Sequence, residues 1–139
     1  MIGQTTVQPV YPTKDQFMRN VLRADGLFCG LVGISALVGA APLAALMGIP
    51  APIALVALGI VCTVYAAILF AFAARERISR WVAITPFVLN ILWVVDSIIL
   101  LSLGLIPLTT AGFWIVVALA DIAAVFAIAQ FIGIRRMVR

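Results

Sequence analysis

The chain of 139 residues contains no histidine and a single lysine, Lys14. Without histidine there is no Ser-His catalytic pair, no imidazole ligand for zinc and no imidazole ligand for haem. Lys14 lies outside every apolar segment, so no buried lysine is available to form a Schiff base. We therefore expect a protein that is not an enzyme, with no catalytic residues, no bound metal and no cofactor.

Charge is also scarce, at 10% of the residues against 65% that are hydrophobic, and the mean hydropathy is +1.27. Residues 26–74 carry no charge, and residues 81–134 carry only Asp96 and Asp121. Each of these two blocks is about twice the ~20 residues that a helix needs to cross a bilayer. The composition therefore predicts an integral membrane protein.

Turn-forming residues divide each apolar block, at residues 48–52 and at residues 104–110. We therefore predict an all-α fold with four transmembrane helices in an up-down-up-down bundle. The sequence predicts a polar N-terminal arm over residues 1–17 and a transmembrane domain over residues 18–139, with helices near residues 26–47, 53–74, 81–103 and 111–134.

The basic residues lie before the first apolar segment, between the second and third, and after the fourth. In bacterial membrane proteins such loops face the cytoplasm, so we expect both termini there. Attraction to the headgroups of membrane lipids explains these basic residues better than binding to nucleic acid does, because the basic residues are split over three short sites. They are Lys14, Arg19, Arg23, Arg75, Arg77, Arg80, Arg135, Arg136 and Arg139.

Small residues mark one side of the first apolar segment, where Gly26, Gly30 and Gly33 recur. Glycine lets two helix backbones approach closely in lipid. Two explanations stay open: packing inside the four-helix bundle, or an interface with another subunit. We expect Gly30 in particular to lie where two backbones meet.

Two cysteines do not form a disulfide framework. Counted from the cytoplasmic edge of the predicted helices, Cys29 is roughly 6 Å deep and Cys62 roughly 18 Å deep. This difference predicts that they are too far apart to pair. Asp25 falls at the start of the first predicted helix, where its expected role is to cap the helix.

The third apolar segment has a polar face on which Pro86, Asn90, Trp93 and Ser97 follow each other at helical spacing, with Asp96 at its edge. We predict that this face points into the bundle. Asp96 would lie roughly 10 Å from the outer end of the helix at 1.5 Å per residue.

A similar stripe in the fourth segment contains Asp121, together with Trp114, Ala118 and Val125. An ionised carboxylate in hydrocarbon costs several kcal/mol, so either the acids are protonated, or they hold a cation, or they face water. We predict one intramembrane polar pocket formed by Asp96, Asp121, Asn90, Tyr65, Thr63, Trp93 and Ser97.

Several short motifs resemble those of a widespread family of small bacterial four-helix integral membrane proteins of unassigned function. The resemblance covers roughly residues 19–136 and implies a bacterial inner membrane. It rests on Leu22-Arg23-x-Asp25, Met47-Gly48-Ile49-Pro50, Tyr65-Ala66, Asn90-x-x-Trp93 and Gly133-Ile134-Arg135-Arg136.

Two functions are consistent with this sequence. The first is a non-catalytic accessory or scaffold subunit, acting as a homo-oligomer or within a larger membrane complex, with membrane lipids as its surroundings. The alternative is a small proton- or cation-coupled carrier that works through Asp96, Asp121 and Asn90.

Overall fold

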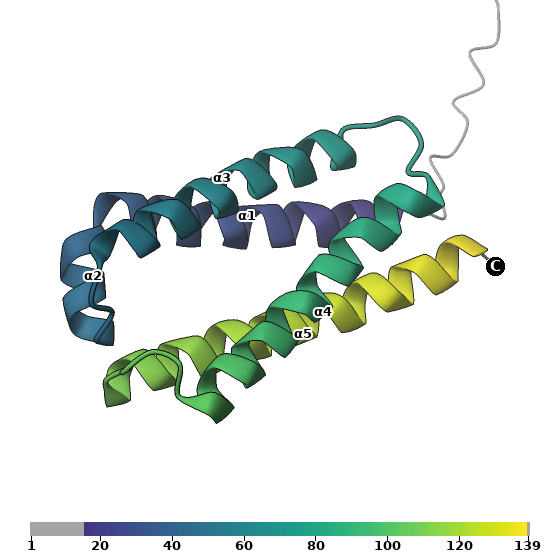
Figure 1. The fold of residues 1–139 in the computed structure, drawn as a ribbon. Helices are drawn as coiled ribbons and strands as arrows, with labels where there is room; N and C mark the ends of the chain where they lie inside the picture. Colours follow the sequence, from purple (N-terminus) through teal and green to yellow (C-terminus); the bar gives the residue numbers. More distant parts are fainter. Residues whose placement is uncertain (1–15, 139) are drawn as a thin grey trace, which may run out of the picture.

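The computed structural model describes residues 16–138, and within them every regular element is a helix (Figure 1). Apart from α2, all of the helices are long and apolar enough to cross a membrane, which confirms the predicted all-α fold and the four candidate spans. Residues 1–15, most of the predicted polar arm, lie outside the described residues. The helices are α1 (Gln16–Val38), α2 (Ala40–Met47), α3 (Pro52–Ala73), α4 (Arg80–Leu103) and α5 (Thr110–Val138).

The first helix differs from its prediction at both ends, because α1 begins ten residues earlier and stops at Val38. Proline lacks an N–H group, and its ring collides with the carbonyl four residues before it. For Pro42 that carbonyl belongs to Val38, so the helix ends there. A short helix, α2, starts after Gly39 and accommodates Pro42 in its first turn.

The other three long helices begin and end close to the predicted residues. Pro52 starts α3, a position that suits proline because the N–H it lacks would have no helical partner. The hydroxyl of Ser79 accepts a hydrogen bond of 3.3 Å from the backbone N–H of Val82 and so caps α4. Gly104 ends α4 with a positive φ of 59°, a conformation that glycine adopts without strain.

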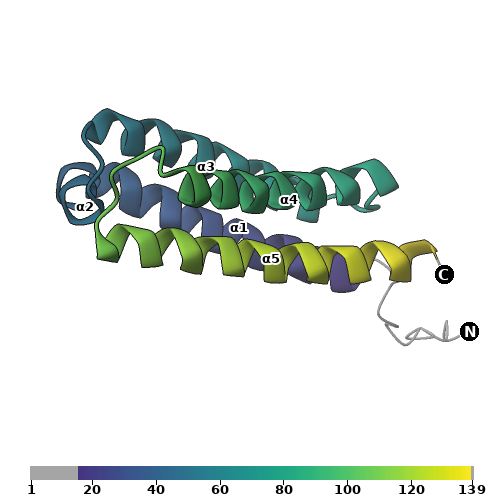
Figure 2. The ribbon, with the colours of Figure 1, turned by 60° about the horizontal axis from the view of Figure 1, so that its bottom comes forward.

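The long helices pack as two pairs, α1 with α3 and α4 with α5. Contacts between α1 and α5 join the pairs, and α2 packs against α3 and α5. Although α3 and α4 follow each other in the chain, they make few close contacts with each other. The side of the molecule between α3 and α4 therefore has few close backbone contacts; Figure 1 shows α4 diverging from α3, and Figure 2 gives a second view of the helices.

The closest approach within the first pair lies at Gly33 of α1. A Cβ atom placed there would lie 2.9 Å from the backbone nitrogen of Thr63 and 3.0 Å from the carbonyl oxygen of Gly59. At Gly26 it would meet side chains of α3 at 3.2 Å or more, and at Gly30 only the Cβ of Ala66, at 3.6 Å. The small residues thus pack within the chain, and the closest backbone contact is at Gly33, not at Gly30 as expected.

Polar contacts hold the two ends of the molecule. At one end the Arg19 guanidinium donates to the carbonyls of Ala73, of Arg75 at 2.5 Å and of Glu76 at 3.3 Å, so it occupies acceptors at the last residue of α3 and just beyond it. At the other end the backbone N–H of Thr109 donates to the carbonyl oxygen of Met47 at 2.9 Å. This contact ties the end of α2 to the start of α5.

Candidate functional site

A buried cluster of three polar side chains connects α1, α4 and α5. Asp25 is 1% exposed, Asn90 7% and Gln130 0%. The Asn90 amide donates to Asp25 Oδ2 at 2.9 Å, and the Gln130 amide donates to the same oxygen at 2.7 Å. The Asn90 amide also donates to Gln130 Oε1 at 3.0 Å, which closes a three-membered network. Because each residue comes from a different helix, the cluster joins the two helix pairs.

The three side chains meet because they lie at the same level of the molecule. The starts of α1 and α4 and the end of α5 lie at one end of the structure (Figure 1). From that end Asp25 is nine residues in, Asn90 ten and Gln130 eight, or about 12 to 15 Å at 1.5 Å per residue. The cluster thus lies well inside the helices, and on α1 it stands where the uncharged run begins, directly before Gly26.

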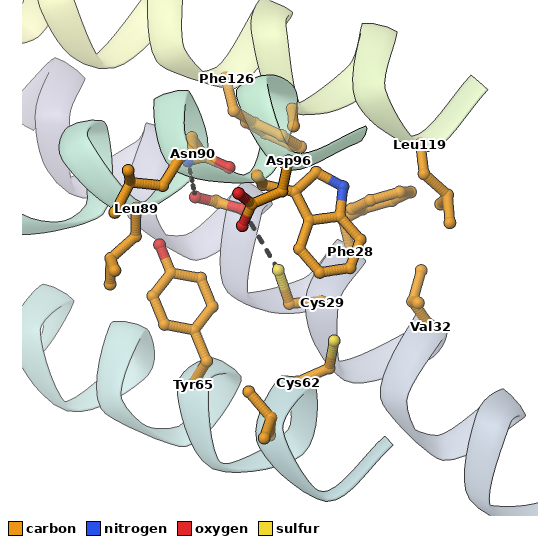
Figure 3. A pocket seen from close by; sticks show the side chains of 15 residues that line it. Phe28, Cys29, Val32, Cys62, Tyr65, Leu89, Asn90, Asp96, Leu119 and Phe126 are labelled. Atoms are coloured by element: carbon orange, nitrogen blue, oxygen red, sulfur yellow. Dashed lines mark hydrogen bonds between the residues drawn. The ribbon is translucent and has the colours of Figure 1, made fainter. Parts of the chain in front are cut away.

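A cavity of about 320 Å³ opens beside this cluster. Its volume is at the lower end of the range for small-molecule sites. Figure 3 shows side chains from all four long helices around it, with Tyr65, Cys29, Asn90 and Asp96 pointing into the space between the helices. The lining residues are Asp25, Phe28, Cys29, Val32, Val61, Cys62, Tyr65, Leu89, Asn90, Leu92, Trp93, Asp96, Leu119, Ala123 and Phe126.

The mouth of the cavity lies between α3 and α4. Of the lining residues, Val61 on α3 is 62% exposed, and Leu89 and Leu92 on α4 are 43% and 50% exposed. Asp96 is exposed on the same side of α4. Since α3 and α4 pack loosely against each other, the cavity is open along this side of the molecule, whereas Asp25 lies at its buried end.

Tyr65 contributes an unsatisfied polar atom to the cavity. Its hydroxyl is buried and has no hydrogen-bond partner among the residues that the structure describes. A buried hydroxyl without a partner costs about 1 to 3 kcal/mol. Because the hydroxyl lies at the cavity wall (Figure 3), it could donate a hydrogen bond to a molecule bound in the cavity or accept one from it.

On the predicted polar face of α4, Pro86, Asn90 and Ser97 are buried, Trp93 is half-buried and Asp96 is exposed. Of these, Asn90 reaches the cavity, as do the neighbouring predicted residues Trp93 and Asp96. Ser97 instead donates to the carbonyl of Trp93 at 2.8 Å and does not line the cavity. Tyr65, predicted from α3, also lines the cavity.

The structure does not bring Asp121 to this cavity. Asp121 is exposed, and so are Trp114, Ala118 and Val125, so the polar stripe predicted on α5 faces outward. The buried face of α5 contains Gln130, which is nine residues from Asp121. At 3.6 residues per turn, nine residues leave two side chains about half a turn apart. Asp121 and Gln130 therefore point in opposite directions.

Thr63 also lies away from the cavity, at the contact between α1 and α3. Its hydroxyl donates to the carbonyl of Gly59, one turn earlier in α3, at 2.7 Å. A bond of this kind satisfies a hydroxyl within its own helix. Thr63 therefore belongs to the helix contact at Gly33.

Sequence reasoning missed the two most buried members of the cluster, Asp25 and Gln130. Asp25 was placed at the helix boundary because Arg19 and Arg23 precede it, but α1 begins before both arginines. Gln130 is an isolated polar residue within an apolar run and formed no pattern with its neighbours. Only the observed ends of α1 and α5 place both residues at the level of Asn90, because the predicted helices put Asp25 outside the first span and Gln130 four residues from the end of the last.

The two cysteines lie closer in depth than the sequence suggested. Because α1 begins at Gln16, Cys29 is 13 residues into its helix, and Cys62 is 11 residues from the end of α3. Both thiols are free and both line the cavity. Cys29 also donates to Asp25 Oδ1 at 3.4 Å, which gives the carboxylate a third donor.

Comparisons with known proteins give no family for this chain. No family model matches it, and neither the curated proteins nor the solved structures contain a significant match. Among residues 16–138 no group of three histidine, cysteine, aspartate or glutamate residues lies close enough together to hold a metal ion.

Proposed function

We propose that this chain is a non-catalytic, multi-pass protein of a bacterial inner membrane that binds a small molecule in the cavity between its two helix pairs. Its four candidate spans and the placement of its basic residues support this location, with the helices running up-down-up-down and both termini in the cytoplasm.

The observation that carries the proposal is the position of Asp25. Its carboxylate is buried at the inner end of an open cavity, where its hydrogen-bond donors are two neutral amides and a thiol. Ionisable groups inside membrane helices are expensive and typically mark the path of a ligand, a proton or an ion. A structural hydrogen bond alone would need no cavity beside it.

Filling the cavity tests this function. Ala123 is buried in the cavity wall, so Ala123→Phe should place a ring inside it. The readout is the fluorescence of Trp93, which lines the cavity, in a background where the exposed Trp81 and Trp114 are replaced by Phe. The probes are benzyltrimethylammonium and its uncharged isostere neopentylbenzene, each titrated into the protein in lipid nanodiscs.

We expect at least one probe to change Trp93 emission in a saturable way, and Ala123→Phe to abolish that change. Ala118→Phe is the matched control, because Ala118 is exposed on the same helix and does not line the cavity. A saturable response from neither probe, or one that survives Ala123→Phe, would rule out a small-molecule site in this cavity.

The role of accessory subunit or homo-oligomer stays a prediction. The glycines that suggested a subunit interface pack against α3 of the same chain, so they no longer support one. Purification in mild detergent tests this role, because a stable complex with another protein would favour the accessory role over independent ligand binding.

A further inference from the structure

We propose that the ligand of this cavity is a small organic cation, with an apolar or aromatic body and a positively charged group directed towards Asp96 and Asp25. This inference rests on the proposed binding function and adds the chemical class of the ligand.

The charges around the cavity all have one sign. Asp25 lines its buried end and Asp96 its mouth, and none of the fifteen lining residues is basic. Asp96 follows Asn90 by six residues, so it lies about 9 Å further along α4 at 1.5 Å per residue. A cation entering at the mouth therefore meets the carboxyl group of Asp96 first and approaches that of Asp25 on the way in, whereas the lining offers an anion no positive group.

The wall between these acids is aromatic. Phe28, Tyr65, Trp93 and Phe126 line the cavity, one from each long helix. The faces of aromatic rings attract cations, and the effect reaches about 2 kcal/mol where water is excluded. Phe28 and Phe126 lie with their ring centres 5.9 Å apart, which keeps these two rings together on the α1 and α5 side.

The same wall argues against a bare metal ion. Sodium, magnesium and calcium ions need several oxygen ligands to replace their water. Here the rest of the lining is mainly aliphatic, from Val32, Val61, Leu89, Leu92 and Leu119. An organic cation suits both parts of the site, because its body buries apolar surface while its charge faces the carboxylates.

The test compares two exposed acids on two membrane helices. Asp96→Asn removes the charge at the mouth, and Asp121→Asn removes a charge that lies outside the cavity. Binding of benzyltrimethylammonium and neopentylbenzene is measured by Trp93 fluorescence in nanodiscs. We expect Asp96→Asn to weaken the binding of benzyltrimethylammonium at least tenfold and Asp121→Asn to change its affinity less than twofold. Neither variant should alter the affinity for neopentylbenzene.

The outcomes separate the two proposals. If both probes bind and Asp96→Asn weakens neither, the cavity binds small molecules but the cationic class is wrong. If neither probe binds, the binding function itself fails, and with it this inference. If Asp96→Asn does not fold, the two probes are compared in the wild-type protein, and that comparison decides whether the ligand is a cation. After subtraction of the signal from Ala123→Phe, benzyltrimethylammonium should bind more tightly than neopentylbenzene, and the reverse order would overturn the inference.

Discussion

Asp25 and Gln130 are 105 positions apart in the sequence, yet Gln130 Nε2 lies 2.7 Å from Asp25 Oδ2. This contact joins the first membrane helix to the last. Because Gln130 is fully buried and also accepts from Asn90, it satisfies polar groups on two other helices at once.

Replacing Gln130 should therefore destabilise the fold. Gln130→Leu removes one donor from Asp25 and one of the two acceptors of the Asn90 amide, and we expect it to lower the free energy of unfolding by about 1 to 3 kcal/mol. The measurement is unfolding in mixed micelles with increasing denaturing detergent. Asp121→Leu on the exposed face of α5 is the control. Equal stability of both variants would show that the network contributes nothing.

The helix contact at Gly33 gives a second prediction. Gly33→Ala adds a methyl group that meets backbone atoms of Thr63 and Gly59, and overpacking of this kind costs about 1 to 3 kcal/mol. Gly30→Ala meets only the Cβ of Ala66 at an ordinary distance, so it should be neutral or slightly stabilising. Thermal unfolding in detergent compares the two. A larger loss at Gly30 would contradict the observed packing of α1 on α3.

Thr109 provides a third prediction, because its hydroxyl makes two contacts. It donates to the carbonyl of Leu46 at 2.5 Å and accepts from the backbone N–H of Gly112 at 3.0 Å, which caps α5. Thr109→Val keeps the shape but loses both bonds, and loss of a helix cap costs about 0.5 to 2 kcal/mol. The adjacent Thr110→Val should change the unfolding temperature little. A similar loss at both positions would remove the special role of Thr109.

Orientation in the membrane is open to a fourth test. We propose that the basic loops and termini face the cytoplasm, as such loops do in bacterial membrane proteins. A reporter that is active only in the periplasm should then work when inserted near Pro52 or Thr109. The same reporter near Ile78, beside Arg77 and Arg80, should be silent. The reverse pattern would place both termini outside the cytoplasm.

The number and approximate position of the long helices followed from the sequence, because apolar length and turn residues are local properties. The helix ends at Pro52 and Gly104 were predictable for the same reason. The start of α1 was not, because Arg19, Arg23 and Asp25 interrupt the apolar pattern from which the helix ends were predicted, although all three lie within the helix.

The site was only half predictable. Asn90, Trp93 and Asp96 followed from the spacing on one helix, which fixes their face relative to each other. Which face of α5 turns inward depends on how α5 packs against α1 and α4, and no pattern within α5 fixes that choice. The acid at Asp121 suggested one face, whereas the packed structure buries the opposite face with Gln130.

The long separation between Asp25 and Gln130 has a consequence for synthesis of the protein. At 5 to 20 residues per second, Asp25 is translated about 5 to 20 s before Gln130, and Asn90 falls between them. Before Asn90 is made, Asp25 on the first helix has neither amide partner, and until Gln130 is made it still lacks the second. A chain that ended before α5 would lack Gln130. Asp25 in that fragment would therefore miss a hydrogen-bond donor that it has in the finished protein.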